Sequence, residues 1–490
     1  NHMDSPQLMD HLTEITPFLE RIDLNNTPCI VSKFSPSTFE MAAIPLLAWI
    51  TMVMYHTMTD GTLSIRRSYK ELTSGRASKL DFLDIFRFVG ILWVMMNHTG
   101  SEGRVDVLER LPSAQIFKNA VHNDPILGAL LGNSALGVEV FLILSGLLAA
   151  RSWLRKADEP FWDHFWSFII RRLFRLAPSM FVFIYIAAGP IMRTVLPRFS
   201  SSMISSCGFS GILSHLTFVS NWQSTPTCMG YLWYLGLDTQ LYIMTPFFLH
   251  LLHKRTRLGV TVTILATIAS CVIRAGYCTK YNICNKSDVD IPFISYPGQD
   301  ESTLRSIYLG LWDIYSMPQT KCGPFLIGIL FGFTTTRVRM TLTPTQSKHL
   351  FRLSLFFAIA TVYAILPEYW YPDAGTTAYN MLYTAIFRSF FALCIGGMIV
   401  AWFYNQELRP VAPIFSVLAK LTYNVYLVHM PVVYIFNWLP FLQSATSGYA
   451  LLVVLPFVAF LSFLVASVLY ILVESPIGRL SSAFATRIGL

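Results

Sequence analysis

The chain has 490 residues, of which 53% are hydrophobic and only 13% are charged, and its formal net charge is +8. This composition argues against a water-soluble protein and is typical of a protein embedded in a bilayer. The positive charge needs no nucleic acid as a partner, because membrane proteins accumulate Lys and Arg in their cytoplasmic loops. The sequence has no P-loop, dinucleotide-binding, HExxH or paired CxxC motif. We therefore expect no tightly bound cofactor and no metal site.

Eleven apolar segments are candidates for membrane-spanning helices. A polar segment, Asn1–Ser37, precedes them, and in chain order they are 39–58, 80–100, 126–149, 177–196, 231–252, 258–276, 322–336, 350–366, 379–404, 421–438 and 449–473. We predict an all-α, polytopic membrane protein of about eleven transmembrane helices. Its expected parts are an N-terminal segment (1–38), a first helix with a basic loop (39–79), a membrane core (80–480) and a short tail (481–490).

The distribution of Lys and Arg predicts the orientation of these helices. The loops after the first, third and fifth helices are rich in both residues, whereas the outer loops at 367–378 and 439–448 contain neither. Because basic residues favour the cytoplasmic side, we expect the N-terminus outside or in a lumen and the C-terminus in the cytoplasm. Such a protein belongs in the endoplasmic reticulum or the plasma membrane.

The cysteines support this orientation. Six of the eight fall outside or at the outer edge: Cys29, Cys207, Cys228, Cys278, Cys284 and Cys322. Disulfides form in oxidising compartments, so these six allow up to three bridges. We favour Cys207–Cys228 and Cys278–Cys284, because each pair closes a loop on its own. Two glycosylation sequons, at Asn25 and Asn285, also lie on the outer side.

The second apolar segment, LDFLDIFRFVGILWVMMNHTG, carries Arg87 and His98. The two residues are eleven positions apart, so on a helix they share one stripe and lie about 16 Å apart along its axis. A buried arginine in a membrane span costs roughly 3 kcal/mol on insertion scales. The stripe is therefore expected to face a polar cavity, unless Arg87 snorkels to the headgroups and His98 lies at the interface.

Five further ionisable residues lie inside predicted spans: Asp84, Glu139, Asp238, Arg388 and His429. Asp84 and Arg388 are best explained as ion-pair partners that fix helix packing. The two histidines and the carboxylates of Glu139 and Asp238 fit two alternatives. They form the cavity of an enzyme that uses general-base chemistry, or the proton relay of a transporter.

Taken together, these blocks resemble the acyltransferase 3 family of integral membrane O-acyltransferases. Arg87 and His98 match the family's Arg-x10-His pattern. LGVEVFLILSGLLAARS resembles its second-helix block with Glu139 in place of Asp, and LWYLGLDTQLY resembles its Trp-x-Leu-x-x-Glu segment with Asp238 in place of Glu. IIRRLFRLAPS, LTYNVYLVHMPVV and VESPIGRL are similar to further blocks, so the likeness covers about residues 80–480.

Within this family the extra N-terminal helix resembles the animal branch named nose resistant to fluoxetine. Members of that branch usually carry a longer cysteine-containing outer domain, so the chain most resembles a short nematode form. The resemblance implies a ten-helix core plus one additional span.

The resemblance also implies transfer of an acyl group from a cytoplasmic acyl-CoA-type donor to a hydroxyl acceptor on the lumenal side. Four arginines would bind the donor's phosphates: Arg87, Arg171, Arg172 and Arg175. His98 would be the general base, with Glu139 or Asp238 orienting its ring, while His429 and Asn97 are further candidates. The alternative is a catalytically silent carrier or a membrane regulator. The acceptor, the acyl length and the oligomeric state stay open.

Overall fold

A computed structural model describes most of the chain. The described residues are 36–75, 80–101, 123–133, 135–204, 207–223, 228–284, 309–310, 312–371, 377–405, 413–437, 439–443, 447 and 449–487. Throughout them the regular structure is helical, with no strand. The predicted all-α fold class is therefore confirmed.

Each of the eleven predicted segments overlaps one long helix. These helices are α2 (Pro36–Met58), α4 (Leu83–Ser101), α7 (Leu136–Leu154), α8 (Phe161–Ala188), α12 (Trp233–Lys254), α13 (Thr256–Lys280), α15 (Pro318–Arg337), α16 (Pro344–Tyr363), α18 (Thr377–Tyr404), α19 (Pro413–Asn437) and α21 (Tyr449–Leu469). In the part of the chain that is described, four helices are long and apolar enough to cross a membrane by length and composition alone: Leu136–Leu154, Thr256–Lys280, Thr377–Tyr404 and Tyr449–Phe484. The protein is an integral membrane protein, and the number of eleven spans stays a prediction.

Shorter elements connect the long helices. They are α3 (Ile65–Thr73), α6 (Leu127–Gly132), α9 (Pro190–Val195), α10 (Pro197–Met203), α11 (Phe209–Leu216), α17 (Leu366–Trp370), α20 (Pro440–Gln443) and α22 (Ser475–Arg487), with 3-10 turns at Ser220–Trp222 and Gly230–Leu232. A π-helical turn, Tyr470–Glu474, joins α21 to α22.

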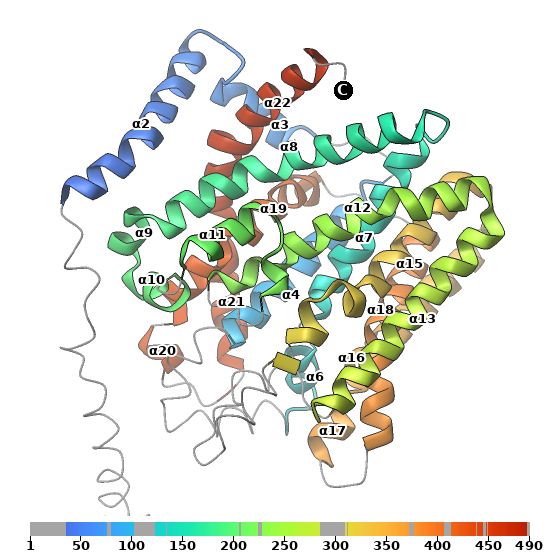
Figure 1. The fold of residues 1–490 in the computed structure, drawn as a ribbon. Coiled ribbons are helices and arrows are strands. Elements are labelled where there is room, and N and C mark those ends of the chain that lie inside the picture. Colours follow the sequence, from blue (N-terminus) through green and yellow to red (C-terminus); the bar gives the residue numbers. More distant parts are fainter. Residues whose placement is uncertain are drawn as a thin grey trace, which may run out of the picture.

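Helix α7 lies at the centre of the bundle (Figure 1), and most of its residues are buried. It packs closely along α15, because glycines bring the two backbones together. A Cβ on Gly146 would lie 2.2 Å from the carbonyl oxygen of Phe325, and one on Gly328 would lie 2.3 Å from that of Ile143. Small residues allow this close approach between membrane helices. The pair α7 and α15 therefore forms the rigid centre around which the other helices are arranged.

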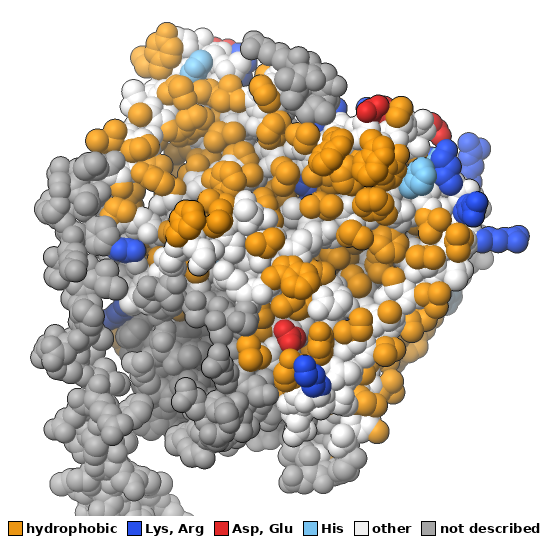
Figure 2. Space-filling model, viewed as in Figure 1, with side chains coloured by type: hydrophobic (Ala, Val, Ile, Leu, Met, Phe, Trp, Pro, Cys, Tyr) orange, Lys and Arg blue, Asp and Glu red, His pale blue; other side chains and the backbone are white. Residues whose placement is uncertain are grey.

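The most apolar helices lie at the periphery of the bundle. Only 22% of the apolar window of α13 and 33% of that of α21 is buried, against 72% for α7. Figure 2 shows hydrophobic side chains spread over the middle of one face, while Lys and Arg gather at its upper right edge. A broad apolar surface with charges at its margin is what a bilayer requires of a protein.

Helix α2 lies at the edge of the bundle (upper left in Figure 1) and continues through a turn into α3. Helix α3 is fastened to the core by two cations. Lys420 of α19 donates to the carbonyl oxygens of Glu71 (2.7 Å) and Ser74 (2.5 Å) at the end of α3, and Arg479 of α22 pairs with the carboxylate of Glu71 (2.9 Å). Cations at a helix C-terminus satisfy its last carbonyls.

Both favoured disulfides are present, Cys207–Cys228 and Cys278–Cys284. Cys271, Cys322 and Cys394 are free thiols. Cys29 and the sequon residues Asn25 and Asn285 lie outside the described residues. The short separation along the chain within each cysteine pair therefore predicted both bridges correctly.

One predicted boundary is wrong by more than four turns. The fourth span was expected to begin at Ala177, after a loop that carries Arg171, Arg172 and Arg175, but α8 begins at Phe161 and includes all three. Pro178 lies inside α8, which continues through it. The arginines therefore have the fixed spacing of a helix, and this is what allows them to line cavities.

Candidate active site

A cavity of about 280 Å³ lies between α4, α7, α8, α12 and α19. Four of the residues that the sequence singled out line it: Arg87, Arg172, Arg175 and Asp238. They come from α4, α8 and α12; α4 and α12 pack against α7, and α8 packs against α12. The cavity therefore brings together most of the predicted donor-binding residues.

The Arg87 end of the stripe predicted for α4 faces this cavity, whereas His98 is not among the residues that line it. Arg87, Ile91 and Val94 are its wall residues on α4, at the i, i+4 and i+7 spacing of one helix face. Arg87 donates to the Asp84 carboxylate, one turn earlier, at 2.5 Å, and Asp84 is buried. The carboxylate offsets much of the cost of placing an arginine here, so Asp84 is the ion-pair partner that the sequence predicted.

Arg172 and Asp238 form an ion pair at the opposite wall. The guanidinium of Arg172 also donates to the Ser145 hydroxyl (3.3 Å) and lies 4.2 Å from the centre of the Tyr242 ring. Asp238 is 4% exposed, and its second oxygen, Oδ1, has no hydrogen-bond partner among the described residues. The pair gives the cavity an arginine in a fixed orientation and a carboxylate oxygen that is still able to accept.

A second, more polar cavity of about 720 Å³ adjoins the first. Arg171, Arg175 and Arg479 line it, together with Glu71 and Glu474. Arg175 lines both cavities. Arg171 and Arg175 face the same space, as their one-turn spacing predicts, but Arg171 is not among the residues that line the first cavity.

His98 of α4 and His429 of α19 are neighbours, with ring centroids 5.0 Å apart. Nδ1 of His429 lies 2.8 Å from the backbone carbonyl of Tyr426. Because a carbonyl only accepts, this nitrogen carries the proton and donates. In the neutral ring Nε2 then holds a lone pair. His429 is fully buried, and Nε2 has no hydrogen-bond partner in the described part of the chain.

A proline and two tyrosines hold the turn of α19 that carries His429. Pro431 lacks a backbone N–H, so the carbonyl of Leu427 loses its helical donor. The Tyr231 hydroxyl donates to that carbonyl instead (3.1 Å), and the Tyr426 hydroxyl donates to the Tyr231 carbonyl. Tyr426 also lines the first cavity. The histidine pair is thus joined to the cavity through one residue.

The Cys207–Cys228 disulfide supports this arrangement from the side. Met229, next to Cys228, has a φ of 44°, and the short turn Gly230–Leu232 then delivers Tyr231 to α19. The His215 ring donates a hydrogen bond to the Cys228 carbonyl (2.7 Å), because a carbonyl oxygen can only accept. The disulfide therefore fixes the segment that positions Tyr231 against His429.

Glu139 has a different set of partners from those expected. Its Oε1 accepts from Lys321 of α15 (2.5 Å) and from Arg388 of α18 (2.6 Å), and all three side chains are buried. The ring of Tyr315 lies 4.3 Å from the Lys321 nitrogen. Glu139 thus joins α7, α15 and α18, and the ion-pair role predicted for Arg388 is confirmed. That Glu139 orients His98 stays a prediction that no described contact supports.

Asp238 likewise pairs with Arg172, so its expected action on His98 stays a prediction as well. Asn97 is half-buried, one position before His98 on α4. The sequence reasoning missed Lys321, which it placed at the end of a polar loop, and Tyr426. Glu139 in mid-span was the available signal for Lys321, because a buried carboxylate needs a cation. Within the described ranges no group of His, Cys, Asp and Glu has the arrangement of a metal site.

A family model described as "Acyltransferase domain" matches residues 80–471. The chain is 64% identical, over all of its length and 99% of the relative's, to "Regulator of hypoxia-inducible factor 1" of Caenorhabditis elegans. It is 24% identical to "Nose resistant to fluoxetine protein 6" of the same organism, over 80% of this chain and 49% of that one.

A bacterial relative, "Putative peptidoglycan O-acetyltransferase YrhL" of Bacillus subtilis (strain 168), is 22% identical over 61% of this chain and 44% of its own. No solved structure matches the chain significantly.

Proposed function

Since this chain belongs to the acyltransferase 3 family, we propose that it is a membrane O-acyltransferase. It takes an acyl group from an acyl-CoA-type donor and transfers it to a hydroxyl group of an acceptor. The family match and the bacterial O-acetyltransferase relative support this class of reaction. The observation that carries the proposal is the cavity lined by Arg87, Arg172 and Arg175, which reaches Tyr426 beside the histidine pair.

The distance between the arginine side chains and the proposed base His98 favours an elongated donor. Arg87 and His98 lie about 16 Å apart along α4. A ligand that contacts both needs anionic groups at one end and the reactive carbonyl at the other, as acyl-CoA has. The phosphates are assigned to Arg87, Arg172 and Arg175, whose planar guanidinium groups bind phosphate oxygens in pairs. The larger cavity with Arg171 and Arg479 has room for the donor's nucleotide end.

In the proposed reaction the acceptor hydroxyl approaches His98. Its oxygen attacks the thioester carbonyl, and the imidazole takes the hydroxyl proton. The carbon–sulfur bond then breaks, the thiolate leaves, and the imidazolium returns the proton to it. Nε2 of His429, 5.0 Å away between ring centres, offers a second acceptor for the proton. A cytoplasmic donor and a lumenal acceptor fit the expected topology.

A second candidate function rests on a specific finding. The relative with 64% identity is named a regulator. A membrane-embedded regulator or carrier that binds an acyl donor without transferring its group would keep the arginines and would not need a base. The two functions therefore differ in what they require of His98.

The test replaces His98 by Asn, which is similar in size and hydrogen bonding but cannot take a proton near neutral pH. The purified protein is given isotope-labelled acetyl-CoA and a membrane extract, and free CoA and acylated products are measured by mass spectrometry. His98→Asn should lower the rate by about 10²–10⁴-fold, because that is the usual contribution of a general base.

The matched control is His250→Asn, the same change at an exposed position near the end of α12. It should leave the rate unchanged, and both variants should bind acetyl-CoA as the unmodified protein does. Transfer at the unmodified rate by His98→Asn would overturn the assignment of the base. Donor binding without transfer by the unmodified protein would favour the regulator or carrier.

A further inference from the structure

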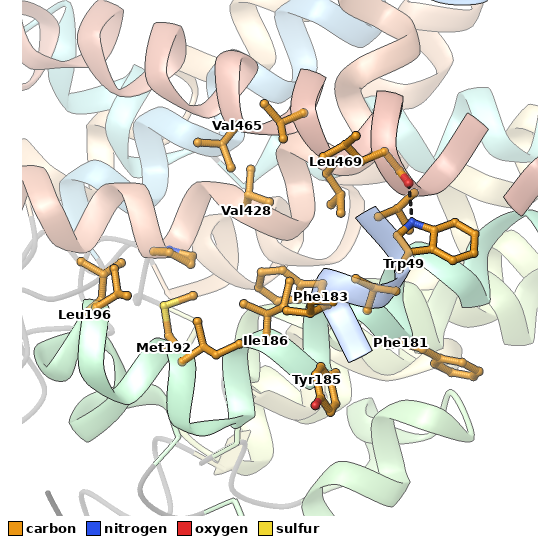
Figure 3. Close-up of a pocket in the computed structure, with 18 of the residues that line it drawn as sticks. Trp49, Phe181, Phe183, Tyr185, Ile186, Met192, Leu196, Val428, Val465 and Leu469 are labelled. Atoms are coloured by element: carbon orange, nitrogen blue, oxygen red, sulfur yellow. Dashed lines mark hydrogen bonds between the residues drawn. The ribbon is translucent and has the colours of Figure 1, made fainter. Parts of the chain in front are cut away.

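An apolar groove of about 860 Å³ separates the extra helix α2 from the core. Figure 3 shows Phe183 and Ile186 of α8 on one side and Val465 and Leu469 of α21 on the other, with Trp49 of α2 at one end. Every residue that lines it is hydrophobic or aromatic. The groove adjoins α2, so it depends on the helix that the family match, which begins at residue 80, does not include.

The two polar side-chain groups of this wall are already satisfied. The Trp49 indole donates to the carbonyl of Leu472 (2.7 Å) in the π-helical turn, and the Tyr185 hydroxyl donates to the carbonyl of Ala42 on α2 (2.8 Å). These two bonds fasten α2 to both walls without closing the space between them. An occupant of the groove therefore finds no free side-chain donor, and a polar ligand would lose most of its hydration without compensation.

The groove is long and lined by apolar side chains, which suits an extended hydrocarbon chain. Its wall on α21 and α22 runs from Leu461 to Ile477, which is about 24 Å at helical rise. A hydrocarbon chain is narrow enough, and the groove volume lies in the range of about 300–1,000 Å³ usual for ligand sites.

The surroundings supply such a chain. The walls belong to α2, α8, α9, α19, α21 and α22, and several wall residues are open to the hydrocarbon region, with Phe181 43% and Val465 39% exposed. An apolar space of this size stays dry, and if empty it forfeits dispersion contacts along its whole length. We propose that this groove binds the hydrocarbon chain of a membrane phospholipid between α2 and the core.

The bound chain lies against the turn of α19 that carries His429. Val428 and Val432 line the groove, whereas His429, between them in sequence, is buried toward His98. The groove and the histidine pair therefore share one helical turn as a wall. The proposal concerns lipid binding alone and does not depend on the protein being an acyltransferase.

The test uses the full chain purified in detergent and phosphatidylcholine with a photoactivatable diazirine in its acyl chain. After illumination, labelled peptides are quantified by mass spectrometry over a range of probe concentrations. Labelling of Trp49, Phe183 and Leu469 should saturate, and unlabelled phosphatidylcholine should compete with it. Phe457 and Phe460, exposed on α21 outside the groove, report non-saturable surface labelling.

Leu469→Trp fills the groove, and it should weaken saturable labelling by about tenfold or more, which is the effect of excluding about two methylene groups. Val453→Trp, at an exposed site of α21 outside the groove, is the matched control and should change nothing. Val465→Phe is a milder filling variant in case Leu469→Trp does not fold. Labelling that never saturates, or that both filling variants leave intact, overturns the proposal.

Discussion

Replacing Glu139 by Gln is expected to destabilise the protein strongly. Lys321 and Arg388 contact the same oxygen of Glu139 at 2.5 and 2.6 Å. The two cations are therefore no more than about 5 Å apart, and at an effective dielectric constant near 20 their repulsion is about 3 kcal/mol. Breaking a buried ion pair by removal of one partner costs a similar amount, about 3–5 kcal/mol.

The number of unpaired buried charges predicts the order of stability of three variants. Lys321→Met leaves a neutral pair of Glu139 and Arg388, so it should be the most stable of the three. The double variant, Glu139→Gln with Lys321→Met, keeps one unpaired cation and should be intermediate. Glu139→Gln alone keeps two and should be the least stable.

The assay is thermal unfolding in detergent, followed with a fluorophore that reacts with the free thiols, of which that of Cys394 is buried, as they become exposed. Glu159→Gln is the control, because Glu159 pairs with Lys156 at the surface (2.9 Å), where an ion pair contributes little. The reasoning is refuted if Glu139→Gln melts with the unmodified protein, or if removing Lys321 from that variant does not restore stability. Loss of transfer at unchanged stability would instead assign Glu139 to catalysis.

Three further predictions concern the donor, the disulfide and the topology. Arg87→Lys keeps the charge but loses the paired donors, so calorimetric titration should show weaker acetyl-CoA binding. The control Arg352→Lys, on the exposed side of α16, should bind acetyl-CoA as the unmodified protein does. Unchanged affinity in Arg87→Ala would exclude a phosphate-binding role for Arg87. Cys207→Ser should slow transfer more than Cys278→Ser does, because only the first bridge holds the segment that positions Tyr231; equal rates would contradict this. In a glycosylation assay Asn285 should be modified and a sequon introduced beside Arg66 should not, and the opposite pattern would invert the predicted orientation.

Local features of the sequence predicted their structural counterparts well. Each hydrophobic segment coincides with part or all of one long helix, since apolar length is a property of one segment. The two disulfides join cysteines 21 and 6 positions apart, so proximity along the chain predicted their pairing. The Arg87 stripe follows from helical periodicity alone, because both of its ends lie on one helix.

Pairings between distant segments were not predictable in the same way. Glu139 is 182 positions from Lys321 and 249 from Arg388, and only the packing of α7 against α15 and α18 brings them together. Asp238 resembled an orienting carboxylate, but Arg172, on a helix expected to start later, is its partner. Charge patterns indicated that these groups needed partners, while the three-dimensional arrangement determined which ones.

The contacts made along helix α19 limit where residues can be inserted into or deleted from the chain. Within little more than three turns Lys420 fastens α3, Tyr426 lines the cavity, His429 meets His98 and Val432 borders the groove. Each faces a different neighbour, so one inserted or deleted residue would turn the remainder of the helix by about 100° and misplace everything beyond it. Single substitutions alter these contacts one at a time. Insertions and deletions in α19 disrupt several of them at once, so among related chains variation in length belongs in the loops.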